Sequence, residues 1–507
     1  MESKFWKKQE RKIVMHGSDM NIIESCVDRH ALFNPNKTAF VFQSYGKVVK
    51  YSYKEIYEKV NQFANLLENS KVKKNSRVFV FLPKVPEMYI SILAVIKQGS
   101  IAAPLFEAFQ TDGLELRLRK GDADVLITNK LLAKRLKHKI KGMKVFVVDS
   151  QIFKNKLKKQ SSYFNCVLKN KKSTALMMFT SSTAGTPVAG VEISHYGLVQ
   201  QHYTAELVLR LNKQSNYWCT AHPGWVTGTI YGLIAPLSIG CTNYVLEEHF
   251  DAKMWIGFLK KNNITTLYTA PTALRLLNGN VKKSDFKHLK VLASVGEALT
   301  ESTFNSYKKL GIRITDTYWQ TETGAMVIAN YDSSKFTMGK AIPGLKVLIN
   351  KGTIALRPKW PSMMTGIYKH KKMYRSYFKN KLFITNDTAK KDKKGYFYFI
   401  ARSDDIIKTS GERVSPIEIE SVLLSYKSIK EAAVIGVPDE IKGSILKAFI
   451  VLKDKVKESD KLKMQISEFV KKYYAGHSYP KIIEFVKSLP KTNSGKIIRM
   501  KLREMES

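Results

Sequence analysis

Residues 174–191 read TALMMFTSSTAGTPVAGV, and this stretch decides the fold class. Its first six residues are an apolar run that predicts a buried strand. Small and hydroxyl residues follow, just before a helix that we predict to begin near His195. Such a loop suits phosphate, because small residues let backbone N–H groups approach oxygen anions and hydroxyls add donors. It is not the Walker pattern, since no Gly-Lys-Ser or Gly-Lys-Thr follows, and taken alone it also fits an ordinary loop.

The chain before this loop alternates between helix and strand patterns. Residues 21–30 and 52–70 have helical periodicity, whereas residues 77–82 (RVFVFL) and 145–148 read as short buried strands. Strands that alternate with helices predict an α/β architecture with a largely parallel sheet.

The pattern changes toward the end of the chain. Residues 395–400 (GYFYFI) alternate like a strand, and from Pro416 a new order begins: helix, strand, strand, helix. We therefore predict an N-terminal domain of residues 1–403 and a C-terminal domain of residues 404–507, which is a common size for a domain.

The composition of the 507 residues, 44% hydrophobic and 25% charged, is that of an ordinary globular protein. No signal-peptide stretch opens the sequence, and its most apolar segment, residues 89–106, is interrupted by Lys97 and Gly99. These features predict a cytoplasmic protein without a membrane partner. The cysteines form no CxxC pair, which argues against a disulfide framework or a zinc site and suits a reducing compartment: Cys26, Cys166, Cys219 and Cys241.

The formal net charge of +41 allows several interpretations. A basic surface could bind nucleic acid or an anionic membrane. The lysines, however, are spread along the whole chain and form no single tail, which favours a lysine-rich exposed surface. A third interpretation is that the positive field attracts polyanionic small molecules. We expect no nucleic-acid partner.

The loop at residues 180–191 resembles the phosphate loop of the adenylate-forming superfamily, which includes acyl-CoA synthetases, firefly luciferase and the adenylation domains of peptide synthetases. The usual form of that loop is TSGTTGxPKGV. Here Ala184 replaces a threonine, and Val188 and Ala189 stand where one lysine is expected. A charge-assisted contact contributes about 1.5–3 kcal/mol, so its loss predicts weakened ATP binding or turnover. The resemblance assigns ATP contacts to Thr180, Ser181, Ser182 (in place of a glycine), Thr183 and Gly185.

A second segment, residues 316–324 (DTYWQTETG), is similar to the nucleotide segment of the superfamily. The resemblance implies that Tyr318 stacks on adenine and that Thr321 contacts the α-phosphate. It also implies that Glu322 holds Mg²⁺, for which a carboxylate is a suitable hard ligand. Further nucleotide contacts are implied for Asp316, Thr317, Trp319 and Gln320.

Two shorter segments complete the nucleotide site that the resemblance implies. Residues 385–387 (TND) resemble a TGD turn whose aspartate, here Asp387, accepts hydrogen bonds from both ribose hydroxyls. Residues 295–299 (VGEAL) resemble the GEPL turn beside adenine and supply Gly296, Glu297 and Ala298.

The C-terminal motifs concern domain movement and catalysis. Residues 489–499 (LPKTNSGKIIR) match the superfamily's C-terminal catalytic loop at nearly every position, which implies that Lys496 brings an ammonium group to the active site. Residues 401–413 (ARSDDIIKTSGER) resemble the hinge segment, where Arg402 would contact nucleotide oxygens and Asp404 would be the pivot. The same resemblance places Ser410, Gly411 and Arg413 along the CoA channel.

Residues 217–228 (YWCTAHPGWVTG) resemble the acetyl-CoA synthetase branch of the superfamily, except that His222 replaces an aspartate. A bulky indole at Trp319 would close the floor of the acyl pocket against longer acids, although it also fits ordinary core packing. Each methylene in a pocket is worth about 1–3 kcal/mol, so propionate is a second candidate beside acetate. The resemblance gives the pocket lining as Val226, Thr227, Val295 and Trp319.

Together these motifs follow the order of the superfamily from Thr180 to Arg499. They imply a large N-terminal domain of α/β subdomains with a small β-barrel-like part, and a small mobile α+β C-terminal domain. The implied activity converts ATP, CoA and a short carboxylate to acyl-CoA, AMP and pyrophosphate through an acyl-adenylate, with Mg²⁺, in a monomer or homodimer. Three alternatives stay open: a catalytically weakened nucleotide-binding paralogue with a regulatory role, another acyl-CoA ligase and, from charge alone, a nucleic-acid-binding protein.

Overall fold

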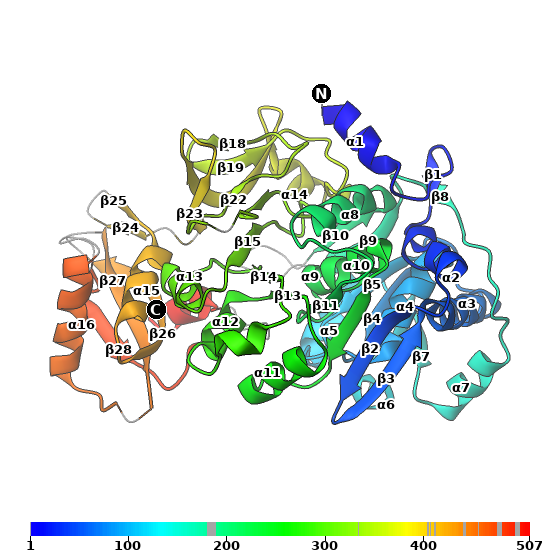
Figure 1. Ribbon diagram of the computed structural model, residues 1–507, viewed down its shortest axis with the longest axis horizontal. Helices are drawn as coiled ribbons and strands as arrows, with labels where there is room; N and C mark the ends of the chain where they lie inside the picture. The colour runs from blue at the N-terminus through cyan, green and yellow to red at the C-terminus, as the bar shows by residue number, and fades with distance from the viewer. Residues whose placement is uncertain are drawn as a thin grey trace.

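The computed structural model describes residues 2–179, 189–332, 334–402, 405, 407–409, 412–439, 443–454, 456–473, 479–491 and 497–506. Within these ranges most of the chain forms layered α/β structure, and a small separate α+β unit follows near the C-terminus, in orange and red in Figure 1. None of the helices in these ranges has the length and apolar character that a bilayer-spanning segment requires.

The first sheet has seven strands. Five neighbouring strands, β9, β5, β4, β6 and β7, are parallel, whereas β10 and β20 at one edge are antiparallel. This confirms the predicted largely parallel sheet. The order across the sheet is β20 (Gly366–Ile367), β10 (Gly190–Ser194), β9 (Thr174–Phe179), β5 (Ile101–Leu105), β4 (Arg77–Phe81), β6 (Val125–Thr128) and β7 (Lys144–Val147).

One prediction around the phosphate loop needs correction. The predicted helix does begin at His195, but the end of the predicted loop is a strand, β10, which pairs with β9 in antiparallel register, with Gly190 opposite Phe179. A Cβ at Gly190 would lie 2.6 Å from the Met177 side chain, so a larger residue here would require that side chain to shift. The chain then turns through a 3₁₀ helix, His195–Gly197, into α8 (Leu198–Leu207).

The second sheet has nine strands, of which the six central ones are parallel. Antiparallel strands close both edges. The order across the sheet is β17 (Lys340–Ala341), β16 (Ile328–Ala329), β15 (Ile314–Tyr318), β14 (Val291–Ser294), β13 (Thr266–Thr269), β11 (Asn216–Cys219), β12 (Thr242–Leu246), β2 (Thr38–Ser44) and β3 (Lys47–Ser52).

A single apolar core lies between the two sheets, and outer cores cover their far faces. Val78 and Val80 of β4 face the central core, whereas Phe79 and Phe81 face an outer core with the helix α5 (Thr111–Lys120). Successive residues of a strand point to opposite faces, so both faces of each sheet are buried. The central core also contains helices α3 (Tyr53–Asn69), α4 (Pro86–Lys97), α8 and α10 (Ala235–Ile239) and the π-helices η1 (Glu24–Asp28) and η3 (Ile230–Ile234). The outer face of the second sheet packs against α11 (Ala252–Lys261), α12 (Pro271–Leu277) and α13 (Glu301–Lys309).

A small antiparallel sheet of five strands joins these layers to the C-terminal unit. It has its own apolar core, which includes Trp360, Phe383 and Phe397. This sheet is the small β part that the sequence predicts. Its members are β18 (Val347–Asn350), β19 (Thr353–Leu356), β22 (Leu382–Lys391), β21 (Phe378–Lys379) and β23 (Phe397–Arg402), and α14 (Lys371–Ser376) lies between β19 and β21 in the chain.

The C-terminal unit has the predicted order of helix, two strands and helix. Its three-stranded sheet packs on one face against α15 and α16 and on the other against α17, which gives it two apolar cores of its own. Contact with the preceding part is made where α15 meets α13 and where Ser415 donates a hydrogen bond to the Ile400 carbonyl. The elements are the hairpin β24 (Ile407–Thr409) and β25 (Glu412–Val414), α15 (Pro416–Ser425), β26 (Ile429–Asp439), β27 (Gly443–Leu452), α16 (Asp460–Tyr473), β28 (Ile482–Phe485) and α17 (Arg499–Glu504).

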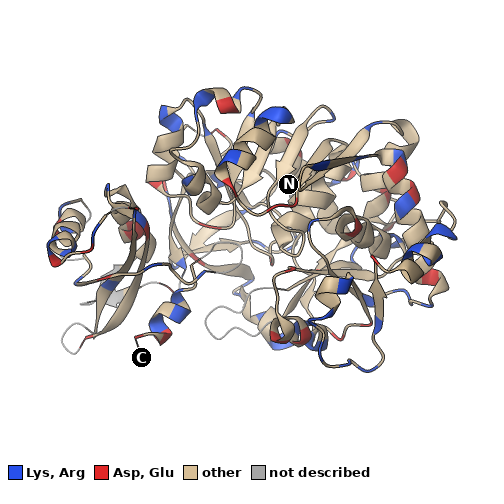
Figure 2. Cartoon of the chain, turned by 90° about the horizontal axis from the view of Figure 1, so that it is seen from below, with Lys and Arg blue, Asp and Glu red and all other residues tan. Residues whose placement is uncertain are grey.

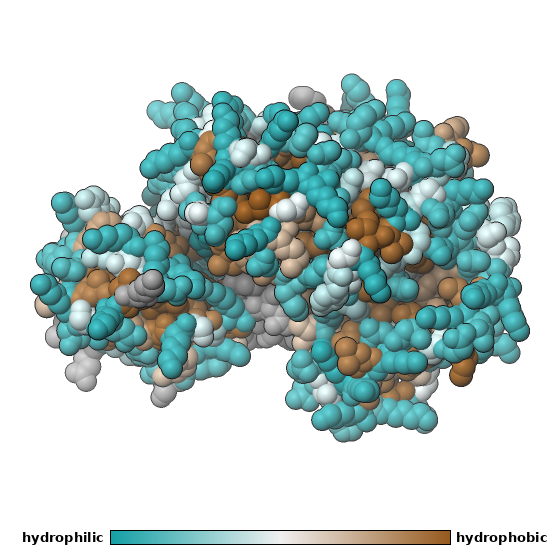
Figure 3. All heavy atoms as spheres, turned by 60° about the horizontal axis from the view of Figure 1, so that its bottom comes forward, coloured by the Kyte–Doolittle hydropathy of each residue, from teal (hydrophilic) through white to brown (hydrophobic). Residues whose placement is uncertain are grey.

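Charged residues are spread over the surface. Figure 2 shows lysines and arginines on every part of the chain in view, interspersed with fewer acidic residues. Hydrophilic residues likewise cover most of the face in Figure 3, with smaller hydrophobic patches between them. This distribution agrees with the interpretation of the +41 charge as a lysine-rich exposed surface.

Candidate active site

The predicted nucleotide and acyl segments follow three adjacent parallel strands in the centre of the molecule (Figure 1). β13 ends at Thr269, β14 at Ser294 and β15 at Tyr318, and the segments 295–299 and 319–324 begin at the next residues. In open α/β sheets ligands bind in the crevice outside the carboxyl ends of the strands. The topology therefore brings these two segments to one place.

The turn after β14 is fixed by its backbone and by α12. Gly296 has a φ of +90°, in the left-handed region that favours glycine. The Glu297 carboxylate accepts hydrogen bonds from Thr272 Oγ1 at 2.7 and 2.9 Å and pairs with Arg275 at 3.3 Å. Ala298 follows, half-buried, in the same turn. These contacts hold the predicted adenine-side turn in one conformation.

Asp387 is the centre of a second cluster. Its side chain is buried and accepts hydrogen bonds from the Tyr318 hydroxyl at 2.7 Å and from Gln320 Nε2 at 2.5 Å. Arg402 lies opposite Asp387 in the register of β22 and β23. The structure thus brings together four residues that the sequence predicts for the nucleotide. It gives Tyr318 a hydrogen bond to Asp387, while stacking on adenine stays a prediction.

Asp316 lies half-buried on β15. Ser294 Oγ donates a hydrogen bond to its carboxyl group at 2.6 Å. Burial raises the pKa of Asp316 to about 7, although the hydrogen bonds from Ser294 and from the Thr317 backbone oppose that rise. The Thr317 hydroxyl does not bind this carboxyl group and instead donates to the Ser294 carbonyl at 2.7 Å. Near neutral pH this carboxyl group therefore exchanges between donor and acceptor forms.

Glu322 lies in the turn that follows Trp319. Trp360 and Ser362 hold this turn by donating hydrogen bonds to the Thr323 carbonyl at 3.0 and 2.8 Å. The Tyr377 hydroxyl donates a hydrogen bond to Glu322 Oε1 at 2.9 Å. Burial raises the pKa of Glu322, and Tyr377 and Arg402 partly offset this rise.

This environment fits a magnesium ion. Mg²⁺ in nucleotide sites is commonly bound by one or two carboxylates together with substrate phosphates and water. Glu322 supplies one such carboxylate, and Thr321 lies half-buried beside it in the same turn. A carboxylate that is already oriented by Tyr377 can meet a cation with little rearrangement.

Three of the four predicted acyl residues belong to or pack against the central core. Val295 and Trp319 belong to one apolar cluster, and Val226 packs against it. The indole N–H of Trp319 donates to the Tyr268 hydroxyl at 3.2 Å. Thr227 follows Val226 in the short helix α9 (Val226–Thr229) and is half-buried. Trp319 is therefore a core residue, and its predicted role in the acyl pocket stays a prediction.

His222 has a structural role that its sequence position did not reveal. Its Nδ1 accepts a hydrogen bond from the Gly224 N–H at 2.8 Å, which leaves Nε2–H to donate to the Leu82 carbonyl at 3.1 Å. Burial lowers the pKa of His222 to about 3, so the imidazole is neutral. It packs edge-on against Phe106 at 5.0 Å. A neutral ring makes both bonds without placing a charge in the core.

Several predicted residues lie outside the described ranges. They are Thr180, Ser181, Ser182, Thr183 and Gly185 of the phosphate loop with Val188, the hinge residue Asp404, the CoA-channel residues Ser410 and Gly411, and Lys496. Arg413 is described only through its backbone, which pairs with Lys408 in the hairpin of β24 and β25. Ala189 is buried next to β10.

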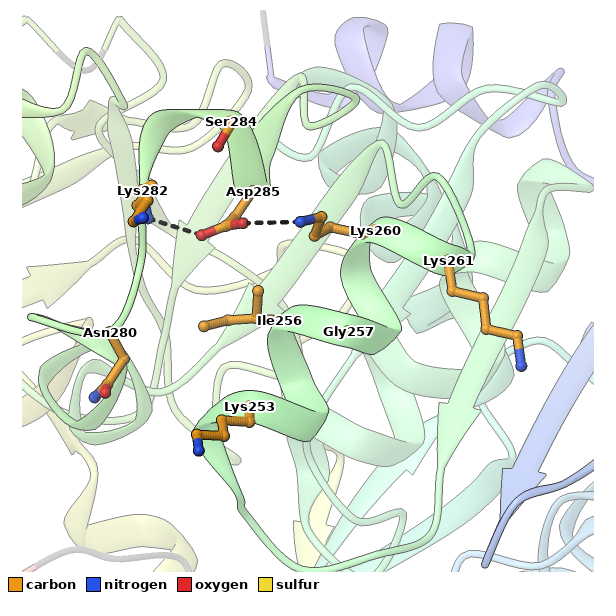
Figure 4. A pocket seen from close by; sticks show the side chains of 9 residues that line it. All are labelled: Lys253, Ile256, Gly257, Lys260, Lys261, Asn280, Lys282, Ser284 and Asp285. Atoms are coloured by element: carbon orange, nitrogen blue, oxygen red, sulfur yellow. Dashed lines mark hydrogen bonds and ion pairs between the residues drawn. The ribbon is translucent and has the colours of Figure 1, made fainter.

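A separate hollow of about 700 Å³ lies at the surface between α11 and the 3₁₀ helix η4 (Lys283–Phe286) (Figure 4). Lys260 pairs with Asp285 at 3.3 Å, and Asp285 also accepts a hydrogen bond from the backbone N–H of Lys282 at 2.8 Å. None of its lining residues belongs to the segments described above, so the hollow is distinct from the candidate site.

Comparison with known families decides the assignment. The family model described as AMP-binding enzyme matches residues 27–354, and the one described as AMP-binding enzyme C-terminal domain matches residues 418–496. The chain belongs to the AMP-binding enzyme family. This confirms the resemblance that the motifs predict.

Curated relatives of this AMP-binding enzyme cover nearly its whole length. The acetyl-coenzyme A synthetase of Bacillus subtilis (strain 168) is 39% identical over 96% of this chain and 91% of its own. The acetyl-coenzyme A synthetase of Methanothrix thermoacetophila is 32% identical, over 95% of this chain and 82% of its own.

Solved structures agree with the fold of the AMP-binding enzyme. The anthranilate CoA ligase AuaEII in complex with anthranoyl-AMP is 25% identical, with a TM-score of 0.88 over 97% of this chain and 98% of its own. The acyl-CoA synthetase of Brucella canis is 27% identical, with a TM-score of 0.75 over 99% of this chain and 97% of its own. The predicted α/β fold with its C-terminal α+β unit is confirmed.

Sequence reasoning missed several residues that orient the site of this AMP-binding enzyme. Tyr377, at the end of α14, binds Glu322 from 55 residues away, and no motif surrounds it. Thr272 and Arg275 hold Glu297 from α12. Tyr268 and Thr272 belong to the segment YTAPT, whose position at the end of β13 is the one signal that could have indicated them.

Proposed function

We propose that this AMP-binding enzyme is an ATP-dependent ligase that joins acetate, or a similarly short acid, to coenzyme A. The observation that carries the proposal is the end of β15, where two consecutive residues face different partners. Tyr318 is hydrogen-bonded to Asp387, while Trp319 contacts Tyr268 and the apolar cluster of Val295. Since these two side chains have different partners, we propose that the nucleotide and the acyl group meet at this point.

The first half-reaction transfers the adenylyl group. An oxygen of the acid attacks the α-phosphorus of ATP, the bond to the β-phosphate oxygen breaks, and pyrophosphate leaves. Asp387 and Arg402 would hold the ribose side of ATP, and Thr321 would contact the α-phosphate. Lys496 would neutralise charge that develops on the transferring group, which is the main contribution a protein makes to such a step.

Glu322 would hold the magnesium ion with its carboxylate, as Tyr377 orients it. Bound Mg²⁺ supplies charge neutralisation for the phosphate oxygens. The turn after β14, with Gly296, Glu297 and Ala298, would border adenine together with Asp316, Thr317 and Gln320.

The second half-reaction forms the thioester. The CoA sulfur attacks the carbonyl carbon of the acyl-adenylate, the bond to the phosphate oxygen breaks, and AMP leaves. Ser410, Gly411 and Arg413 would line the path of CoA. We propose that residues 1–403 and 404–507 act as two units around Asp404, which is supported by the separate apolar cores on the two sides. Movement of such a unit is a common way to separate successive steps.

The acid would be selected by Val226, Thr227, Val295 and Trp319. Relatives named acetyl-coenzyme A synthetase at 30–39% identity support acetate. The four cysteines are free thiols, which supports a reducing cytoplasm as the place of action, with small molecules as the only partners, in a monomer or homodimer.

The test is to measure pyrophosphate release with ATP and a series of acids from acetate to hexanoate, and AMP formation with and without CoA. We expect release with acetate, a lower rate with propionate and little with longer acids, and AMP turnover that needs CoA. Binding of ATP without pyrophosphate release from any acid would instead favour a nucleotide-binding paralogue, for which the absent lysine at Val188 and Ala189 is the supporting observation.

A further inference from the structure

The indole of Trp319 is fixed by a directed chain of hydrogen bonds. An indole N–H can only donate, so the Tyr268 hydroxyl accepts from it at 3.2 Å. Tyr268 then donates its own proton to Thr317 Oγ1 at 2.8 Å, and Thr317 donates to the Ser294 carbonyl at 2.7 Å. The chain ends on the backbone of β14, so each donor and acceptor has one defined role.

A second chain holds the ring that packs against the indole. The rings of Tyr231 and Trp319 form a T-shaped pair with a centroid distance of 5.0 Å and an interplanar angle of 77°. The Tyr231 hydroxyl accepts from the Met326 N–H at 2.9 Å and pairs with Thr204 Oγ1 at 2.7 Å. Thr204 donates in turn to the Gln200 carbonyl at 2.8 Å. This second chain anchors Tyr231 to α8.

Because these hydrogen bonds are buried, they restrict the orientation of the Trp319 indole. Tyr268 and Tyr231 are fully buried, and Trp319 is 9% exposed. An indole N–H that lost its partner here would find no water to replace it, and leaving a buried donor unpaired is costly. The indole therefore cannot swing away without breaking a bond that nothing replaces.

We propose that Tyr268 is a positioning residue that sets the length of acid accepted, because its hydroxyl fixes the wall formed by Trp319. The proposal rests on the proposed function, since it needs Trp319 to face the acyl group. Tyr268 does not touch the reacting atoms. Its effect is to keep the indole in the one orientation that excludes an additional methylene.

The first experiment compares Tyr268→Phe with a matched control, Tyr307→Phe. Both changes remove one hydroxyl from a fully buried tyrosine, and Tyr307 donates to the Leu274 carbonyl at 3.0 Å in the outer core, away from Trp319. We expect Tyr268→Phe to raise the ratio of kcat/KM for propionate to that for acetate about three- to tenfold, a part of what one methylene is worth in a pocket. Tyr307→Phe should leave that ratio unchanged, and the Tm of each variant shows that it is folded.

A double-mutant cycle with Trp319→Phe makes the test specific. The Trp319→Phe variant has no indole N–H, so the Tyr268 hydroxyl can no longer hold the side chain at position 319. Tyr268→Phe in that background should therefore leave the propionate-to-acetate ratio unchanged. An equal change of the ratio in both backgrounds would overturn the proposal. The proposal would also be overturned if wild type preferred acetate to propionate and folded Tyr268→Phe had the same propionate-to-acetate ratio as wild type. A wild type that forms AMP from neither acid would overturn the proposed function itself, and the inference with it.

Discussion

Among single residues, Asp316 offers a direct electrostatic test. Burial raises the pKa of Asp316 to about 7 in the folded chain, whereas aspartate in an unfolded chain has a pKa of about 3.9. Between these values the folded chain binds one more proton than the unfolded chain, so this group makes stability fall as pH rises, with no further change above about pH 7. Asp316→Asn removes this dependence.

We therefore expect the free energy of unfolding of Asp316→Asn, relative to wild type, to increase by about 1 kcal/mol per pH unit between about pH 5 and pH 7. Urea titrations at several pH values measure this difference directly. A difference that stays constant over that range would contradict the raised pKa.

Tyr377 provides a second prediction at this scale. Tyr377→Phe removes the hydroxyl that binds Glu322 and keeps the ring stacked on Phe383 at 5.5 Å and 12°. Removing such a supporting bond commonly lowers metal affinity about tenfold or more, so we expect weaker binding of Mn²⁺ as a probe in the presence of nucleotide. Electron paramagnetic resonance of free Mn²⁺ measures the affinity, and the Mg²⁺ dependence of pyrophosphate release should shift in parallel.

The matched control for Tyr377 is Tyr374→Phe. Tyr374 lies on α14 and packs against Phe378 at 5.1 Å. We expect its loss of a hydroxyl to leave Mn²⁺ affinity unchanged. If both variants bound Mn²⁺ as wild type does, the assigned role of Tyr377 would be wrong.

The residues that the sequence could not explain share a physical reason. His222 binds the Leu82 carbonyl, 140 residues away, and the Trp319 indole binds Tyr268, 51 residues away. Such pairs depend on how strands are ordered in a sheet, which local patterns do not encode. Residues inside recognisable motifs, such as Asp387 and Glu322, can be assigned a role from the sequence because the motif includes their neighbours, and that role stays a prediction.

At the scale of secondary-structure elements, long apolar patterns were predictable and short or irregular elements were not. The predicted strand at 77–82 corresponds to β4, and the predicted helix at 52–70 corresponds to α3, whose start is fixed by the capping box of Ser52 and Glu55. The predicted helix at 21–30 is present, but its middle, Glu24–Asp28, is a π-helix that continues into α2 (Arg29–Phe33). β10 depends on pairing with β9, and strand formation is set by such partners more than by intrinsic preference.

The phosphate loop gives the prediction that belongs to this scale. We propose to replace the pair Val188–Ala189 by a single lysine, which restores both the usual length and the missing cation. A charge-assisted contact contributes about 1.5–3 kcal/mol, so KM for ATP should fall by roughly tenfold or more in steady-state pyrophosphate assays.

The control for this loop replaces the same pair by a single methionine, which shortens the loop equally and has a similar unbranched stem without the charge. We expect it to leave KM for ATP close to that of wild type. Equal gains from lysine and methionine would mean that loop length, and not the cation, limits ATP binding.

For the whole molecule, the question is how the C-terminal unit carries Lys496. Arg499, three residues after it, donates to both oxygens of Glu420 on α15 at 2.8 and 2.6 Å and pairs with Asp405 at 3.4 Å. On the other side, Lys491 forms a β-bridge with Ile497. The described residues on both sides of positions 492–496 are thus bound within the C-terminal unit and to Asp405, next to the predicted hinge. We expect variants of Lys496 and of the predicted hinge residue Asp404 to affect different half-reactions.

The roles proposed for Lys496 and Asp404 predict that their variants separate the two half-reactions. Lys496→Ala should abolish acyl-adenylate formation from ATP and acetate, because the cation is needed only while phosphate charge develops. It should spare thioester formation from supplied acetyl-adenylate and CoA. Asp404→Pro should do the reverse, since it restricts the backbone at the pivot while leaving the lysine in place.

Both half-reactions can be measured for each variant by pyrophosphate release and by thioester formation from synthetic acetyl-adenylate, with Lys487→Ala as the control. Lys487 is exposed and lies two residues after β28 in the C-terminal unit, so its loss should leave both rates unchanged. If Lys496→Ala lost both half-reactions equally, the lysine would be supporting the structure and not the adenylyl transfer. If Asp404→Pro kept both, rotation about that residue would not be what gives CoA access, and the two units would have to exchange reactants in a single arrangement.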